Sequence, residues 1–143
     1  MKIVLDTNVI VSGLLNPSGF PGRILDLVNT EHVTVLYDDR ILAEYRDVLG
    51  RPRLRIEPTE ALLILDQIEK GGMLLLAEPI EIELPDPYDL PFLEVAEAGG
   101  AAALVTGNGR HFIPRRGTTA VAVLTPAEFF TFWQQSRRYP PFD

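Results

Sequence analysis

The stretch Lys2-Ile3-Val4-Leu5-Asp6-Thr7-Asn8-Val9 lies at the start of the chain and carries its most informative pattern. Residues 2–5 form a short apolar run rich in β-branched side chains, which predicts a buried strand. Thr7 and Asn8 are both able to cap a helix over residues 8–15. Asp6 is therefore expected at the carboxyl end of a strand, and this is where open α/β sheets bind their ligands.

Strand-like and helix-like segments alternate along the rest of the chain. Further strands are predicted at residues 33–37, 73–76, 102–106 and 120–124, and helices at 23–29, 39–49, 57–70, 90–98 and 126–133. Residues 16–22 hold two prolines and two glycines and predict a loop, and residues 80–84 predict an edge strand or an extended lead-in. The pattern predicts a three-layer α/β/α sandwich with a mostly parallel central sheet of about five strands.

The length and composition indicate one domain and exclude several kinds of site. The 143 residues suit a single domain over residues 1–135 with a C-terminal tail over 136–143. The chain has no cysteine and two histidines, so thiolate metal sites, disulfides and cysteine nucleophiles are excluded. No apolar run approaches the roughly 18 residues of a membrane span, and the first residues do not resemble a signal peptide. We therefore expect a cytoplasmic protein without membrane contact.

The net charge of −7 argues against a large non-specific nucleic-acid surface. Eleven of the 13 basic residues are nevertheless arginines, the side chain best shaped to hold phosphate. Eight of the basic residues fall in three clusters: Arg51, Arg53 and Arg55; Arg110, Arg115 and Arg116; Arg137 and Arg138. Each cluster is either solvated surface or a local phosphate contact.

Three acids occupy comparable positions around the predicted sheet. Asp6 ends the first strand, Glu44 borders the apolar face of a helix, and Asp89 begins a helix after a proline turn. Taken singly, each has an ordinary explanation: a turn residue, a surface acid and a helix cap. Carboxylates gathered at one edge repel one another unless a cation holds them, so their joint occurrence predicts a divalent-metal site. Asn108, after the fourth strand, lies beside Asp6 if the two strands are neighbours.

Four segments together resemble the PIN-domain family, in particular small bacterial PIN proteins described as toxins of toxin-antitoxin pairs. They are Val-Leu-Asp-Thr-Asn-Val at 4–9, Leu-Ala-Glu-Tyr-Arg-Asp-Val-Leu-Gly-Arg-Pro at 42–52, Asp-Pro-Tyr-Asp-Leu-Pro-Phe-Leu-Glu-Val-Ala at 86–96 and Leu-Val-Thr-Gly-Asn at 104–108. The resemblance extends from Lys2 to about Trp133, which is nearly the whole chain.

The resemblance implies a ribonuclease that uses Mg²⁺ or Mn²⁺, with an antitoxin protein and a second copy of the chain as possible partners. It places the family's acids at Asp6, Glu44 and Asp89, whereas its fourth acid is replaced by Asn108. The predicted supporting residues, which orient these acids, are Asn8, Thr106 and Asp86. The loop residues predicted to contact RNA phosphate are Arg110, His111 and Arg115, although a solvated basic loop explains them as well.

Two other functions remain open on the sequence. Because Asn108 is neutral, the protein is alternatively a catalytically weak or inactive member that binds RNA or a partner. A phosphotransferase of the haloacid dehalogenase kind also has an aspartate after its first strand, but Asn8 replaces its second acid and no convincing lysine follows. Residues 129–133 carry four aromatic side chains and form either a dimer contact or the core face of the last helix.

Overall fold

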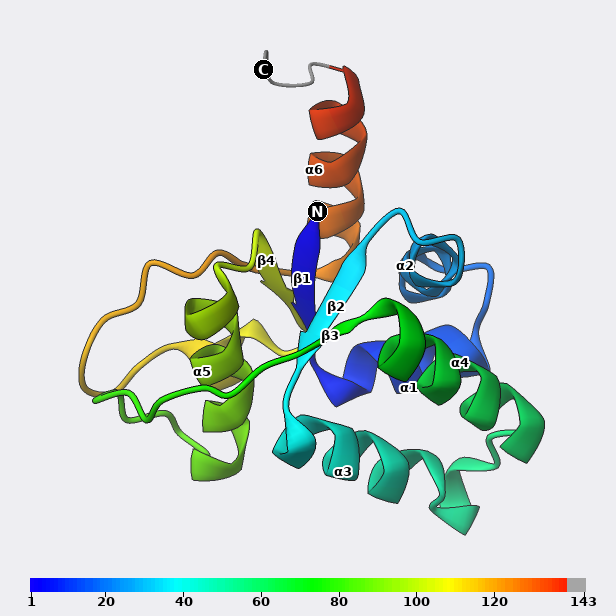
Figure 1. Ribbon diagram of the computed structural model, residues 1–143, viewed down its shortest axis with the longest axis horizontal. Coiled ribbons are helices and arrows are strands. Elements are labelled where there is room, and N and C mark those ends of the chain that lie inside the picture. Colours follow the sequence, from blue (N-terminus) through cyan, green and yellow to red (C-terminus); the bar gives the residue numbers. More distant parts are fainter. Residues whose placement is uncertain (139–143) are drawn as a thin grey trace.

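A computed structural model describes residues 1–138 as a parallel sheet enclosed by helices. The strands are β1 (Lys2–Leu5), β2 (Thr34–Tyr37), β3 (Met73–Leu74), β4 (Ala103–Val105) and β5 (Val123–Leu124). They lie in the order β3-β2-β1-β4-β5, and every pairing between them is parallel. The predicted α/β/α sandwich is confirmed (Figure 1).

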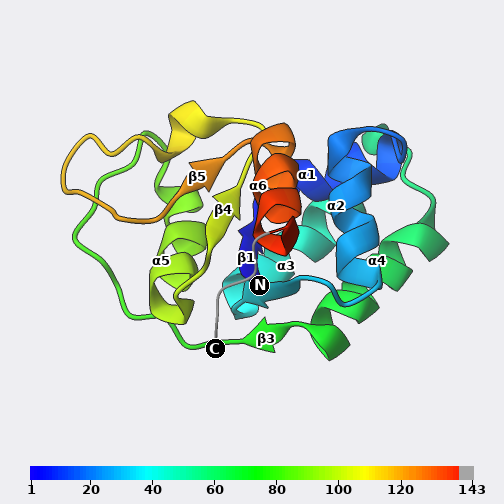
Figure 2. The same ribbon diagram turned by 90° about the horizontal axis from the view of Figure 1, so that it is seen from above.

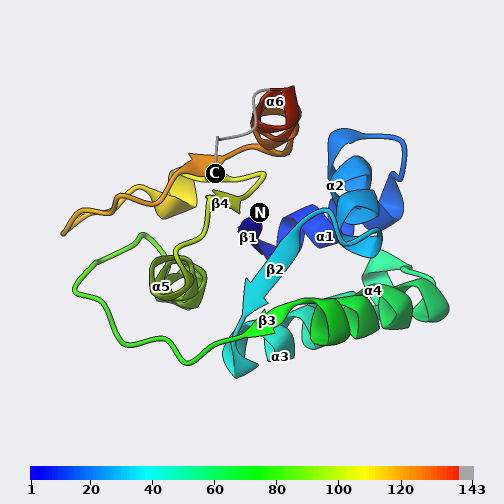
Figure 3. The same ribbon diagram turned by 45° about the horizontal axis from the view of Figure 1, so that its top comes forward.

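Six α-helices cover the sheet: α1 (Thr7–Leu15), α2 (Phe20–Asn29), α3 (Asp39–Leu49), α4 (Pro58–Gly71), α5 (Leu90–Gly99) and α6 (Pro126–Arg138). Short 3₁₀ turns lie at η1 (Pro52–Leu54), η2 (Pro87–Asp89) and η3 (Gly109–Phe112). Figure 2 and Figure 3 show α5 on one side of the sheet and α1, α2 and α4 on the other. Figure 1 shows α3 below the carboxyl ends of β1 and β2.

The core forms where the sheet is covered on both faces. Ile3, Val4 and Leu5 of β1 are fully buried, as are the three residues of β4. Continuous apolar strands of this kind are typical of parallel sheets, because helices on both faces remove alternate side chains from water equally. β1 therefore occupies the centre of the core, and the residue that follows it lies at a well-ordered position.

Several boundaries differ from those predicted. The predicted loop over 16–22 is shorter, because α2 begins at Phe20 and accepts Pro21 in its first turn, where no backbone N–H is needed. Gly22 is required there, since a Cβ would lie 2.1 Å from the carbonyl oxygen of Pro17. Residues 80–84 form no strand and contribute only an antiparallel bridge between Glu83 and Arg116.

The C-terminal helix extends through Arg138, three residues past the predicted end of the domain at 135, and residues 139–143 lie outside the described part. Three of its four aromatic residues contact the core. Phe129 is fully buried, while Phe130 and Trp133 pack against the core and Phe132 is 40% exposed. The interpretation of this segment as the core face of the helix therefore holds for most of its aromatic rings.

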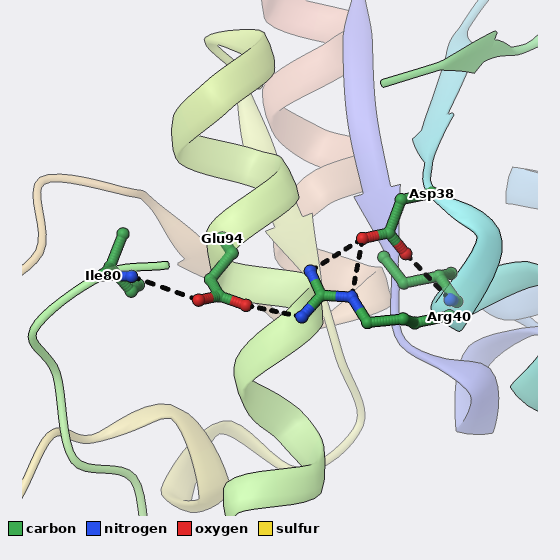
Figure 4. Close-up of polar contacts among 5 residues, drawn as sticks. Asp38, Arg40, Ile80 and Glu94 are labelled. Atoms are coloured by element: carbon green, nitrogen blue, oxygen red, sulfur yellow. Dashed lines mark hydrogen bonds and ion pairs between the residues drawn. The ribbon is translucent and has the colours of Figure 1, made fainter. Parts of the chain in front are cut away.

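A buried polar bridge joins α3 to α5 near the sheet. Arg40 donates hydrogen bonds of 2.7 and 2.9 Å to Asp38 and one of 2.8 Å to Glu94 (Figure 4). Asp38 caps α3 through the Ile41 N–H, and Glu94 accepts the Ile80 N–H at 3.1 Å. Both carboxylates are buried and need these partners, since an unpaired buried charge is strongly destabilising. The bridge fixes the positions of α3 and α5, the two helices that border the sheet's carboxyl edge.

Candidate active site

The site lies between β1 and β4, where the order in which the chain adds strands to the sheet reverses. From β1 the chain continues to β2 on one side, whereas β4 lies on the other side with Leu5 beside Val105. In open α/β sheets this topology leaves a crevice at the carboxyl ends of the two strands. The first residues beyond the paired positions are Asp6 and Thr106, so both side chains lie at that crevice.

Asp6 is the buried acid of this crevice, with 7% of its surface exposed. Its Oδ2 accepts hydrogen bonds from the Thr106 hydroxyl at 2.7 Å and from the Asn8 side-chain amide at 3.1 Å. Burial raises the pKa of Asp6, and its hydrogen bonds and His111 offset part of that rise. Asp6 begins α1 without capping it through its side chain, so neither Thr7 nor Asn8 is the cap that the sequence predicted.

Glu44 reaches the same region from α3. The Thr7 hydroxyl donates a hydrogen bond to Glu44 Oε2 and so connects α3 to the residue after Asp6. Burial raises the pKa of Glu44, and the negative charges of Asp6 and Asp86 raise it further. The next residue, Tyr45, is fully buried and its hydroxyl donates to the Leu5 carbonyl, which holds α3 against the end of β1.

Asp89 is the acid whose environment departs most from the sequence prediction. It precedes α5 but makes no capping bond with its side chain, because the 3₁₀ turn η2 leads directly into the helix and the backbone is already helical at Asp89. Its Oδ2 is buried and has no hydrogen-bond partner within residues 1–138. The His111 Nδ1 atom lies 3.5 Å from this oxygen.

Electrostatic coupling joins the three acids. Burial, together with the charges of Asp6, Asp86 and Glu44, raises the pKa of Asp89 to about 6, while His111 acts in the opposite direction. Asp6 raises the pKa of Glu44 as well. The charge of one acid raises the pKa of another, so the folded protein holds these carboxylates close enough to repel one another. This repulsion lowers the stability of the fold.

The predicted supporting residues take different positions. Thr106 and Asn8 contact Asp6 directly, and the Asn8 Oδ1 also accepts the Gly107 N–H at 3.1 Å. Asp86 is exposed and its side chain accepts the Tyr88 N–H, so its hydrogen bond serves the turn. Asn108 is exposed, and its backbone N–H donates to the Thr106 hydroxyl at 2.9 Å. Asn8 and Asn108 line a cavity of about 260 Å³ beside the crevice.

The three loop residues predicted to contact RNA are separated by the fold. His111 lies beside Asp89, as described above, on the 3₁₀ turn η3 that also carries Arg110. Arg110 and Arg115 are both exposed, and neither forms an ion pair with another residue in the described 138. Both guanidinium groups are therefore open to solvent.

Thr7 is a site residue that the sequence reasoning missed. It was considered only as a helix cap, yet it holds Glu44. A hydroxyl residue directly after a strand-ending acid was the available signal, but its partner lies 37 positions away. Only the packing of α3 beneath β1 reveals the contact.

The acids have the right chemistry for a hard divalent cation, because Mg²⁺ and Mn²⁺ prefer carboxylate oxygen. The buried Asp89 Oδ2 without a hydrogen bond is an atom that such a cation would satisfy. Across residues 1–138, however, no three Asp, Glu or His side chains are grouped closely enough to hold a metal ion as they stand. The donor set fits a metal in kind, whereas the side-chain arrangement of the described residues does not enclose one.

A parallel sheet with coupled acids at its point of reversal defines an α/β protein with a candidate hydrolytic centre. A family model described as PIN domain matches residues 2–110. The chain therefore belongs to the PIN-domain family. PIN domains are a superfamily of nucleases that are usually metal-dependent, and this membership disfavours the haloacid dehalogenase alternative.

A shorter stretch of the chain is similar to one further protein. The chain is 44% identical over 55 residues to a protein of Methanocaldococcus jannaschii called "Uncharacterized protein MJ1680". The matched stretch covers 38% of this chain and 36% of that relative, so it spans about a third of the relative's length.

No helix within residues 1–138 combines the length and the apolar character that a membrane crossing requires.

The raised pKa of Asp89 predicts a pH dependence of stability. A group whose pKa rises from 3.8 to about 6 on folding favours the folded state at low pH, and this contribution is lost as pH rises through 6. In EDTA, the free energy of unfolding from urea titrations should therefore fall by about 1 kcal/mol more between pH 5 and pH 7 in the wild type than in Asp89→Asn. Equal pH dependence in the two proteins would contradict the raised pKa of Asp89 in the folded protein.

Proposed function

We propose that this protein is a ribonuclease that hydrolyses RNA phosphodiester bonds with Mg²⁺ or Mn²⁺, and that it acts in the cytoplasm as the toxin of a toxin-antitoxin pair. The single observation that carries the proposal is the buried Asp89 Oδ2, which accepts no hydrogen bond among residues 1–138, in a group of mutually repelling acids. A stable fold has little reason to keep such a group unless a ligand of opposite charge completes it. Membership of a nuclease superfamily supports the same assignment.

In this proposal Asp6, Glu44 and Asp89 hold the metal, and the neutral oxygen of Asn108 takes the place of a fourth acid. A bound divalent cation supplies two effects: it lowers the pKa of a bound water and it neutralises charge on the phosphate oxygens. The roles of the chain itself are positioning. Thr106 and Asn8 orient Asp6, Thr7 orients Glu44, and the exposed Arg110 and Arg115 attract the phosphate backbone.

The alternative is a PIN-fold protein that binds RNA or a partner and turns over poorly. The observation that favours it is Asn108, which removes one negative charge and lies at the exposed rim of the site. The family resemblance also leads us to propose two partners, an antitoxin protein and a second copy of the chain. The mostly buried rings of α6 leave Phe132 as its one strongly exposed aromatic side chain for such contacts among the described residues.

The direct test of the function is cleavage of a mixed RNA pool with Mg²⁺, with Mn²⁺ or with EDTA. Asp6→Asn keeps the size of the side chain but removes its charge, so it should lower metal-dependent cleavage by more than about a hundredfold. Asp66→Asn makes the same change at an exposed position of α4 and should cleave as the wild type does. Cleavage that persists in Asp6→Asn, or that is equally fast in EDTA, would remove the acids from the mechanism.

The role of Asn108 is tested by adding the missing charge. If Asn108 faces the metal, Asn108→Asp should tighten Mn²⁺ binding about tenfold, because a carboxylate is a stronger ligand than an amide oxygen. Isothermal calorimetry at fixed pH measures this change directly. An unaltered or weaker affinity would show that position 108 lies outside the metal's surroundings.

A further inference from the structure

A second concave site lies beyond the acids, between the end of α3, the turn η1 and the start of α4. It is a pocket of about 480 Å³, within the range of small-ligand sites. Its walls are mainly apolar and come from Leu49, Ile56, Ala61, Leu62 and Leu65. Leu49, Ala61 and Leu65 are buried and form its floor, whereas Leu62 is 66% exposed at its rim.

Three arginines line the same pocket: Arg46, Arg51 and Arg55. Arg46 pairs with Glu69, and Arg51 pairs with Asp47 at 2.9 Å, both at exposed positions. Exposed pairs of this kind contribute little and exchange readily for another anion. Arg55 forms no ion pair with any residue between Met1 and Arg138. The pocket therefore combines an apolar interior with available guanidinium groups, in a protein whose net charge is −7.

The backbone at Arg55 is unusual and contributes to this arrangement. Its φ of 54° and ψ of 35° place it in the left-handed region, which is costly for a residue with a side chain. Residues held in such conformations cluster at ligand-binding sites, where the surrounding structure maintains them. Here the conformation ends η1 and turns the chain toward α4, so Arg55 borders the pocket.

The pocket and the acids are connected through α3, which carries Glu44 and leads to Arg51. Glu44 and Arg51 are seven residues apart along α3 and its end, which corresponds to roughly 10 Å at a helical rise. A single extended strand is therefore able to contact both sites at once.

We propose that this pocket binds one unpaired nucleotide of the RNA strand, with its base against the apolar wall and its phosphate on Arg55 and Arg51. The inference rests on the proposed ribonuclease function and adds a second contact for the same strand, away from the cleaved bond. Arginine holds phosphate in a fixed planar geometry, and the aliphatic wall buries the apolar face of any base without reading its edges, so the site selects single-stranded RNA irrespective of sequence. An acidic protein segment is the competing occupant, and the test below separates the two.

The test measures binding without cleavage. A fluorescein-labelled 12-nucleotide oligouridine is titrated with the full chain in EDTA, and fluorescence anisotropy gives the affinity at several salt concentrations. The chain offers two matched pairs of positions. Arg55 lines the pocket whereas Arg53, in the same turn, does not; Leu62 lines it whereas Leu63, 65% exposed, faces another cavity.

The expected result separates the phosphate contact from the apolar contact. Arg55→Ala should weaken binding five- to tenfold and reduce the salt slope by about 0.7, the value for one contact to single-stranded nucleic acid. Leu62→Ser should weaken binding about threefold and leave the salt slope unchanged. Arg53→Ala and Leu63→Ser should remain within twofold of the wild type.

Three outcomes would overturn the proposal: equal effects of Arg55→Ala and Arg53→Ala, no effect of Leu62→Ser, or no binding of the oligouridine by the wild type. The first indicates diffuse surface charge, and the last leaves the acidic protein segment as the occupant. Cleavage of the RNA pool is measured separately. Cleavage with no Arg55 effect rejects the pocket alone, whereas Arg55-dependent binding without cleavage rejects the nuclease alone.

Discussion

The hydrogen bond from Thr106 to Asp6 joins the carboxyl ends of β1 and β4, and the candidate site depends on it. It fixes the acid that ends the central strand at the point where the order of the sheet reverses. Every other contact of the site is added around this pair: Asn8 supports Asp6, and Thr7 brings in Glu44. Without a fixed Asp6, the remaining acids would have no common centre.

Burial raises the pKa of all three acids, because it removes their charged forms from water. Hydrogen bonds compensate Asp6, and Thr7 compensates Glu44, but Asp89 receives no such bond in the described chain. Its raised pKa and exposed fraction of 16% describe a group that is destabilising in the protein by itself. Natural proteins tolerate such groups mainly at functional sites, where a ligand recovers the cost.

Much of the fold was predictable because the relevant signals are local. The apolar β-branched runs and the alternating helices predicted all five strands and their layers, and Gly100 ends α5 in the left-handed conformation that a helix end favours. The predicted boundaries were wrong where packing decides. Pro21 and Gly22 are compatible with a loop or with a helix start, and the close approach of the Pro17 carbonyl, which leaves no room for a Cβ at residue 22, is not visible in the sequence.

The site was predictable in its membership more than in its geometry. Residue type and position indicated Asp6, Glu44 and Asp89, but the sequence assigned Asp89 to a helix cap because it contains no sign that η2 replaces that cap. The role of Thr7 and the position of His111 beside Asp89 depend on contacts between distant segments. Local patterns therefore indicate candidate side chains, and tertiary packing determines which of their atoms remain available.

The central claim is that the acids at residues 6, 44 and 89 share one divalent cation. The most direct measurement is anomalous diffraction from crystals of the protein soaked in Mn²⁺. The account predicts a manganese peak between the carboxylates of Asp6 and Asp89, with Glu44 in direct contact or bridged by water. Manganese found only elsewhere on the surface, with Asp89 unchanged, would contradict it.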